Sequence, residues 1–158
     1  MSCSPFFLRV PAFVRLAALG ACALALALGG AAARAGTVTI QQTDGSTQTY
    51  SDVVVKVIHN ILYVSSADGK GTMIISRAAC AYQGQILVCL PTAMTLSQNG
   101  AVNPIKLRKG TLYVNLTDQT QQLAASTMKM SPHSIILSME TKVGTYVNVS
   151  GAIDKVTP

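Results

Sequence analysis

The chain has 158 residues, of which 49% are hydrophobic and only 11% are charged, and its formal net charge is +6. This length is sufficient for one domain, and a charged fraction below half of the ~25% usual in soluble domains excludes charge-driven disorder. The four cysteines and two histidines occur at no spacing that zinc ligands use, so we expect neither a metal site nor a cofactor.

Residues 1–35 have the pattern of a secretory signal peptide. A positively charged start is followed by an uncharged run over 16–33 that is rich in Leu and Ala. Ala33-Arg34-Ala35 then offers small residues at the −3 and −1 positions of a cleavage site. We therefore expect a periplasmic or secreted protein that meets the membrane only transiently, through this peptide.

Two alternatives remain open for the same segment. The uncharged run over 16–33 is near the lower limit of length for a retained membrane anchor. Leu19-Gly20-Ala21-Cys22 resembles a bacterial lipobox, in which Cys22 would carry the lipid. In that case, however, the apolar run before the cysteine would be shorter than the usual hydrophobic region of a signal peptide.

Cleavage would leave residues 36–158 as a single domain with a different composition. Nine lysines and arginines then face six carboxylates, so the net charge is +3. All three phenylalanines lie in the removed segment, and the five tyrosines are the only aromatic residues of the mature chain. A mild charge and few aromatic side chains argue against a nucleic-acid partner.

Short alternating or β-branched segments follow one another along the mature chain, as in an all-β protein. Strands are expected at 37–43, 47–51, 53–58, 61–65, 72–76, 94–97, 105–108, 112–117, 135–139 and 145–149, and near Ile153. Turn residues separate them, for example Asp44-Gly45, Lys109-Gly110 and Ser150-Gly151. The fold class expected is all-β, a single-domain antiparallel sandwich or jelly-roll-like barrel.

The segment 80–89 predicts a β-hairpin closed by a disulfide. Gly84-Gln85 suits a two-residue type II′ turn, which has glycine at its first position. That register places Cys80 directly opposite Cys89 in a non-hydrogen-bonded pair, where Cα atoms lie about 4.5 Å apart, within disulfide reach. An oxidising destination permits the bond.

Lys106, Arg108 and Lys109 form the basic cluster of the mature chain. Lys106 and Arg108 alternate with apolar residues, so a strand would place both on one face. One interpretation is contact with an anion, such as a lipid phosphate or an acidic glycan. The other is that the charges keep an edge strand from pairing with other chains.

Residues for catalysis are few. His59 and His133 could each act as a base, but neither lies in a nucleophile signature such as G-x-S-x-G. The carboxylates lie mostly at predicted turns, where Asp commonly stabilises the backbone. We therefore expect no enzyme activity.

Three hypotheses follow for function. The first is an exported, non-catalytic domain with a structural or interaction role and an unknown protein partner. In its run of short strands the chain also resembles periplasmic OstA-like jelly-roll proteins, which implies the handling of lipid or lipopolysaccharide in the cell envelope. An apolar groove of Val, Ile and Met would then take acyl chains, with Lys106 and Arg108 near the headgroup. The third hypothesis is a small exported hydrolase that uses His59 or His133.

Overall fold

The computed structural model describes residues 36–76, 79–123 and 126–158, so the predicted signal peptide lies outside the described residues. Within these ranges the chain forms strands and no helix. The strands are β1 (Gly36–Gln41), β2 (Thr47–Ile58), β3 (Ile61–Ser65), β4 (Gly71–Ser76), β5 (Cys80–Gln83), β6 (Ile86–Cys89), β7 (Ala93–Gln98), β8 (Ala101–Asn115), β9 (Gln121–Gln122), β10 (Lys129–Met130), β11 (Ser134–Thr141) and β12 (Tyr146–Thr157).

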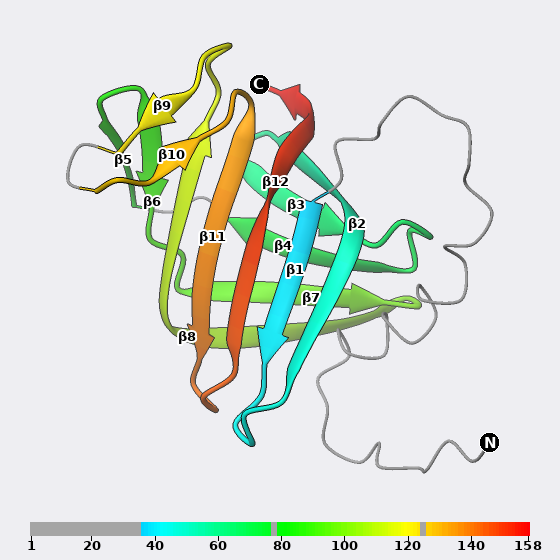
Figure 1. The fold of residues 1–158 in the computed structure, drawn as a ribbon. Helices are drawn as coiled ribbons and strands as arrows, with labels where there is room; N and C mark the ends of the chain where they lie inside the picture. Colours follow the sequence, from blue (N-terminus) through cyan, green and yellow to red (C-terminus); the bar gives the residue numbers. More distant parts are fainter. Residues whose placement is uncertain (1–35, 77–78, 124–125) are drawn as a thin grey trace.

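Eight of these strands form a closed antiparallel barrel (Figure 1). They are paired in the order β1–β2–β3–β4–β7–β8–β11–β12, and the pairing of β12 with β1 closes the barrel. The order follows the chain, interrupted only by the inserted hairpins β5–β6 and β9–β10. The prediction of an antiparallel all-β domain is therefore confirmed. A meander around one barrel differs from the two sheets of a sandwich and from the Greek keys of a jelly roll.

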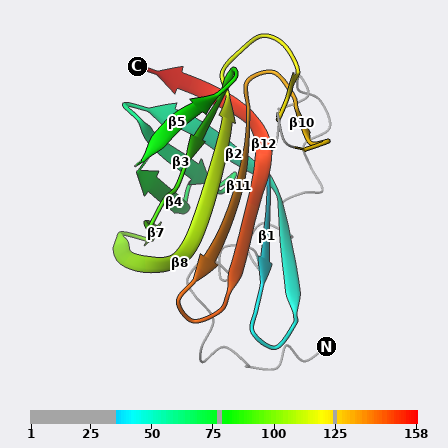
Figure 2. The ribbon, with the colours of Figure 1, turned by 90° about the vertical axis from the view of Figure 1, so that its left-hand side faces the viewer.

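Strand β8 shows that one predicted turn is wrong. The sequence predicts a turn at Lys109-Gly110, but β8 runs through this dipeptide as one strand, and Figure 2 shows that the strand is bent. Its pairing with β11 shifts register between Glu140 and Thr141, which identifies a β-bulge. Because of the bend, the first part of β8 pairs with β7 and the last part pairs with β6 and β11.

Two other long strands replace pairs of short predicted ones. β2 joins the predicted segments 47–51 and 53–58 through Asp52, which has a φ of 63°. β12 continues through Ser150-Gly151, and beyond the end of β1 it pairs with β2 in parallel. Bulged, bent strands are one way in which a sheet curves enough to close on itself.

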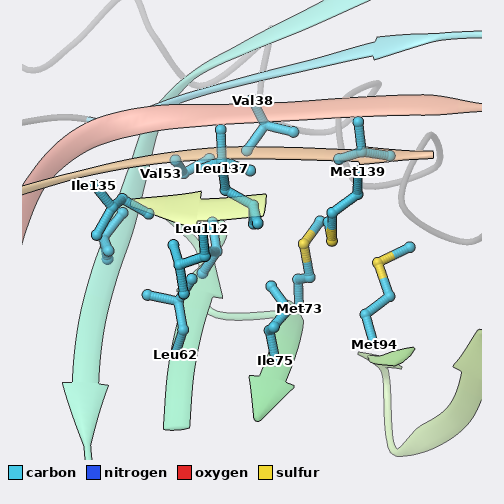
Figure 3. Packing of buried hydrophobic residues seen from close by; sticks show 14 of the residues in the cluster. Val38, Val53, Leu62, Met73, Ile75, Met94, Leu112, Ile135, Leu137 and Met139 are labelled. Atoms are coloured by element: carbon cyan, nitrogen blue, oxygen red, sulfur yellow. The ribbon is translucent and has the colours of Figure 1, made fainter. Parts of the chain in front are cut away.

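The barrel interior is filled by the inward-facing side chains of its strands. Alternate residues point inward, as in Val53, Val55 and Val57 of β2, and all of these are buried. Aliphatic and methionine side chains from facing strands meet in one cluster, part of which is shown in Figure 3. No phenylalanine or tryptophan is needed, because small β-branched residues and leucine fill a narrow barrel closely.

The predicted disulfide hairpin is confirmed. β5 and β6 pair with Cys80 opposite Cys89 and Gln83 opposite Ile86, and the two cysteines are bonded with their Cα atoms 4.1 Å apart. Gly84 has a φ of 62°, as the first position of a type II′ turn requires. The hairpin extends the sheet beside the last part of β8.

The second insertion is tied to the barrel by Asn115, which is fully buried at the end of β8. Its Nδ2 donates hydrogen bonds to the carbonyl oxygens of Gln119, Met130 and Ser131, and its Oδ1 accepts from the backbone N–H and the hydroxyl of Thr117. One side chain therefore connects both ends of the insertion that carries β9 and β10. Beneath this insertion lies a second small apolar cluster around Ile86, Leu123 and Met130.

Candidate functional site

The candidate site is the open end of the barrel where the β1–β2 and β11–β12 hairpins turn. The tips of these hairpins lie side by side in Figures 1 and 2, and a Cβ placed on Gly144 would be 3.3 Å from Thr43 Cγ2. A hollow of about 770 Å³, here called the mouth, opens between these tips and strands β7 and β8. Its lining comprises Ile40, Gln42, Thr43, Met73, Met94, Leu96, Pro104, Ile105, Lys106, Thr141, Lys142, Val143, Thr145 and Val147.

The floor of the mouth is apolar and belongs to the barrel core. Met73, Met94 and Leu96 are buried, and they come from β4 and β7 on one side of the barrel. In Figure 3 Met73 reaches from β4 into the part of the core that Met139 enters from β11, and Met94 also lines the mouth. Methionine side chains are flexible and polarizable, so a floor of this kind can adapt to irregular apolar shapes.

The rim of the mouth carries two exposed lysines. Lys106 lies on β8 and Lys142 on the β11–β12 turn, and the backbone N–H of Lys142 donates to the carbonyl of Lys106 at 3.3 Å. In the described part of the chain neither ammonium group forms a salt bridge. Next to Lys142, Val143 is 77% exposed at the hairpin tip. Sequence reasoning found Lys106 but missed Lys142, which is remote along the chain.

Gln42 contributes an unusual polar group to the wall of the mouth. Its Nε2 atom is buried and has no hydrogen-bond partner among the described residues. Burying an unpaired amide donor costs about 1–3 kcal/mol, and an acceptor oxygen entering the mouth is one group that could remove this cost. No sequence signal marked this glutamine, because its burial depends on the packing of two hairpins.

The other two predicted basic residues have a partner. Glu140 is buried opposite the β8 bulge, and its carboxylate oxygens lie 3.4 Å from Arg108 Nη1 and 3.5 Å from Lys109 Nζ. The bulge turns both cations outward over this one carboxylate. They compensate a buried charge, which is costly when it is unpaired. Of the predicted cluster, only Lys106 lines the mouth, and its role in anion contact stays a prediction.

Neither histidine is part of the lining of the mouth. His133 lies in the turn before β11 with a φ of 45°, and its Nε2 contacts the carboxylate of Asp118. His59 is exposed in the β2–β3 turn. A catalytic triad also needs a nucleophile hydrogen-bonded to the histidine, and no side-chain hydroxyl bonded to His133 is found in the described ranges.

Among residues 36–76, 79–123 and 126–158, no group of three or more His, Cys, Asp or Glu side chains is placed to hold a metal ion. The same residues contain no helix with the length and hydropathy that crossing a membrane requires. No protein-family model, no curated protein and no solved structure matches this chain.

Proposed function

We propose that this chain is an exported, non-catalytic binding domain that holds a small, mainly apolar molecule in the mouth of its barrel. The observation that carries the proposal is the mouth itself, a hollow of about 770 Å³ with a floor of buried methionine and leucine. Sites for drug-sized ligands are about 300–1,000 Å³ and mostly apolar, with a few polar groups that set orientation.

The position of the hollow supports the same function. Closed barrels of about eight strands are filled by their own side chains or hold one small ligand at an end. Here the interior is filled while the end between the two hairpins stays open. A molecule bound there would cover the apolar floor, and its polar end would lie among Gln42, Lys106 and Lys142 on the wall and rim.

Export and the absence of catalysis belong to the proposal as well. The signal-peptide pattern of residues 1–35 and the Cys80–Cys89 bond both suit an oxidising compartment, the periplasm or the cell exterior. The groups that line the mouth are amide, hydroxyl, ammonium and apolar groups. They suit binding, and they offer no paired acid and base for hydrolysis.

The lipid-handling hypothesis becomes the more specific form of this proposal. An amphiphile with one acyl chain would place its tail on the methionine floor and its carboxylate or phosphate near Lys106. The headgroup contact predicted for Arg108 is dropped from the proposal, because that side chain faces Glu140 instead of the mouth.

Titration with a neutral fluorescent hydrophobe, such as N-phenyl-1-naphthylamine, tests the proposal directly. The blocking variant is Thr43→Trp, because Thr43 lines the mouth and is exposed, so that a larger side chain at this position should narrow the opening. The matched control is Thr49→Trp, since Thr49 is exposed on β2 and is not part of the lining. The mature chain has no other tryptophan, so each introduced indole also reports its own surroundings.

We expect saturable binding by the unaltered protein, at least about tenfold weaker binding by Thr43→Trp, and unchanged binding by Thr49→Trp. A factor of ten corresponds to about 1.4 kcal/mol, which is close to the value of burying one or two methylene groups. If the protein does not bind the probe, or if the two variants bind it equally, the mouth is not the binding site.

A further inference from the structure

We propose that the rim of the mouth docks on an anionic lipid surface, so that the mouth opens toward the lipids. This inference rests on the proposed function, because it assigns the source from which the mouth receives its molecule. It concerns a different set of groups, namely the cations around the rim and the apolar tip between them.

The charge near the mouth is positive. Lys106 and Lys142 lie on the rim, and Arg108 and Lys109 follow within three residues on the outer wall of β8. The carboxylates nearby are Glu140 beside the bulge and Asp44 at the tip of the β1–β2 hairpin. Among the residues that the structure describes, these four cations stand against these two carboxylates, a local net charge of +2.

In the described part of the chain neither carboxylate forms a salt bridge with the two rim lysines. Glu140 lies between Arg108 and Lys109. Asp44 accepts a hydrogen bond from the backbone N–H of Ser46 at 2.8 Å within its own turn, and the hydrogen bonds from Ser46 lower the pKa of Asp44. Lys106 and Lys142 remain available to the negative surface potential of a membrane, which attracts basic residues that lie within a Debye length.

An apolar side chain stands beside these lysines. Val143 is 77% exposed at the tip of the β11–β12 hairpin, directly after Lys142 and on the lining of the mouth. An exposed apolar tip flanked by a lysine can enter the interfacial region of a lipid layer while the ammonium group meets the headgroups. A soluble anion would need the lysines but would gain nothing from Val143, so the pair favours a lipid surface.

Docking of the rim would also bring the apolar floor close to the lipid. Lys106, Lys142 and Val143 all line the hollow that has Met73 and Met94 at its base. A molecule leaving the lipid layer would then cross to the floor with little exposure to water, which reduces the cost of moving apolar surface.

The experiment is co-sedimentation of the full exported protein with vesicles. Vesicles of phosphatidylcholine with phosphatidylglycerol are compared with vesicles of phosphatidylcholine alone, at low and high salt. The variants are Lys106→Gln, Lys142→Gln, their combination and Val143→Ser, all at exposed positions. The matched control is Lys155→Gln, an exposed lysine near the other end of β12.

We expect binding to the anionic vesicles only, weakened by salt. A lysine near an anionic surface contributes about fivefold to partitioning, so each single lysine variant should bind about fivefold more weakly and the combination about 25-fold more weakly. Val143→Ser should also weaken binding to the anionic vesicles relative to the unaltered protein, whereas Lys155→Gln should change this binding less than about twofold. Equal binding to both kinds of vesicle, no binding, or equal effects of rim and control lysines would overturn the inference.

Failure of the docking and failure of the proposed function give different results. Probe binding and vesicle binding are therefore measured on the same preparations, and Thr43→Trp should lose the probe while keeping vesicle binding. Normal probe binding without vesicle binding would overturn the docking alone. If the unaltered protein does not bind the probe, the proposed function is overturned, whatever the result with vesicles.

Discussion

Replacement of Asn115 by alanine should destabilise the protein more than any other exchange of a single polar side chain discussed above. Asn115 Nδ2 donates to the carbonyl oxygens of Gln119 and Ser131 at 2.9 Å each, and its Oδ1 accepts from the Thr117 N–H at 3.0 Å and hydroxyl at 2.8 Å. Each such bond contributes about 1 kcal/mol net. Water can replace some of them at the exposed Gln119, so we expect a loss of about 3 kcal/mol.

Urea unfolding followed by circular dichroism measures this loss. With an m-value of about 1.5 kcal/mol/M, the midpoint should fall by about 2 M at unchanged m. The matched control is Asn148→Ala, because Asn148 is exposed on β12 and its Oδ1 accepts one bond, from the Ser138 hydroxyl at 2.7 Å. The control should lose no more than about 0.5 kcal/mol.

Asn115→Asp separates the donor role from the packing role. It keeps the shape and the acceptor for Thr117, but it removes the amide donor and places a carboxylate against three carbonyl oxygens. Its loss should exceed that of alanine at neutral pH and should shrink in acid, where a protonated carboxyl can donate. A loss below about 1 kcal/mol for alanine would refute the role given to Asn115.

Three further predictions concern the disulfide, the bend of β8 and a half-buried tyrosine. Replacing both Cys80 and Cys89 by serine should lower the free energy of unfolding by about 2.7 kcal/mol, the chain-entropy value for a loop of about ten residues; urea unfolding with and without reductant checks this. Gly110→Ala should cost about 1–3 kcal/mol, because its Cβ would lie 2.9 Å from the carbonyl oxygen of Pro91, and an unchanged melting temperature would show that the bend tolerates a side chain. Burial raises the pKa of Tyr50 from 10.0 to about 12. Between these values the folded protein keeps a proton that the unfolded chain has lost, so stability should fall as pH rises from about 10 to 12. Tyr50→Phe should flatten that slope, and an equal slope in both proteins would contradict the assignment.

The local features of this fold were predictable from neighbouring residues. The register of the 80–89 hairpin follows from the glycine at its turn and from the two cysteines at its ends, so the disulfide could be derived without any distant contact. The alternation of Leu112 and Val114 with Tyr113 and Asn115 likewise predicted a strand over 112–117. Such signals lie within a few residues of one another, where turn chemistry and side-chain period decide the structure.

The barrel and its mouth depend on contacts between distant segments. Lys109-Gly110 has the composition of a turn, but pairing with β7 on one side of the bend and β11 on the other keeps the strand continuous. Gly110 is needed there because it packs against Pro91. In the same way, Gln42 and Lys142 meet at the mouth only because the barrel closes. The salt bridge between Arg108 and Glu140 could not be predicted from the sequence either, because it depends on the register between β8 and β11.

The central claim is that the barrel mouth holds a small apolar molecule, and native mass spectrometry of the exported protein tests it most directly. The protein is purified without detergent, and its native spectrum is compared with its denaturing, non-reducing spectrum. We expect a bound small molecule in the native spectrum, its loss on denaturation, and a chain mass two hydrogens below that of the reduced protein. The native spectrum of purified Thr43→Trp should lack the bound molecule, and that of Thr49→Trp should contain it. A bare chain from every preparation, together with no binding of added hydrophobe, would contradict the claim.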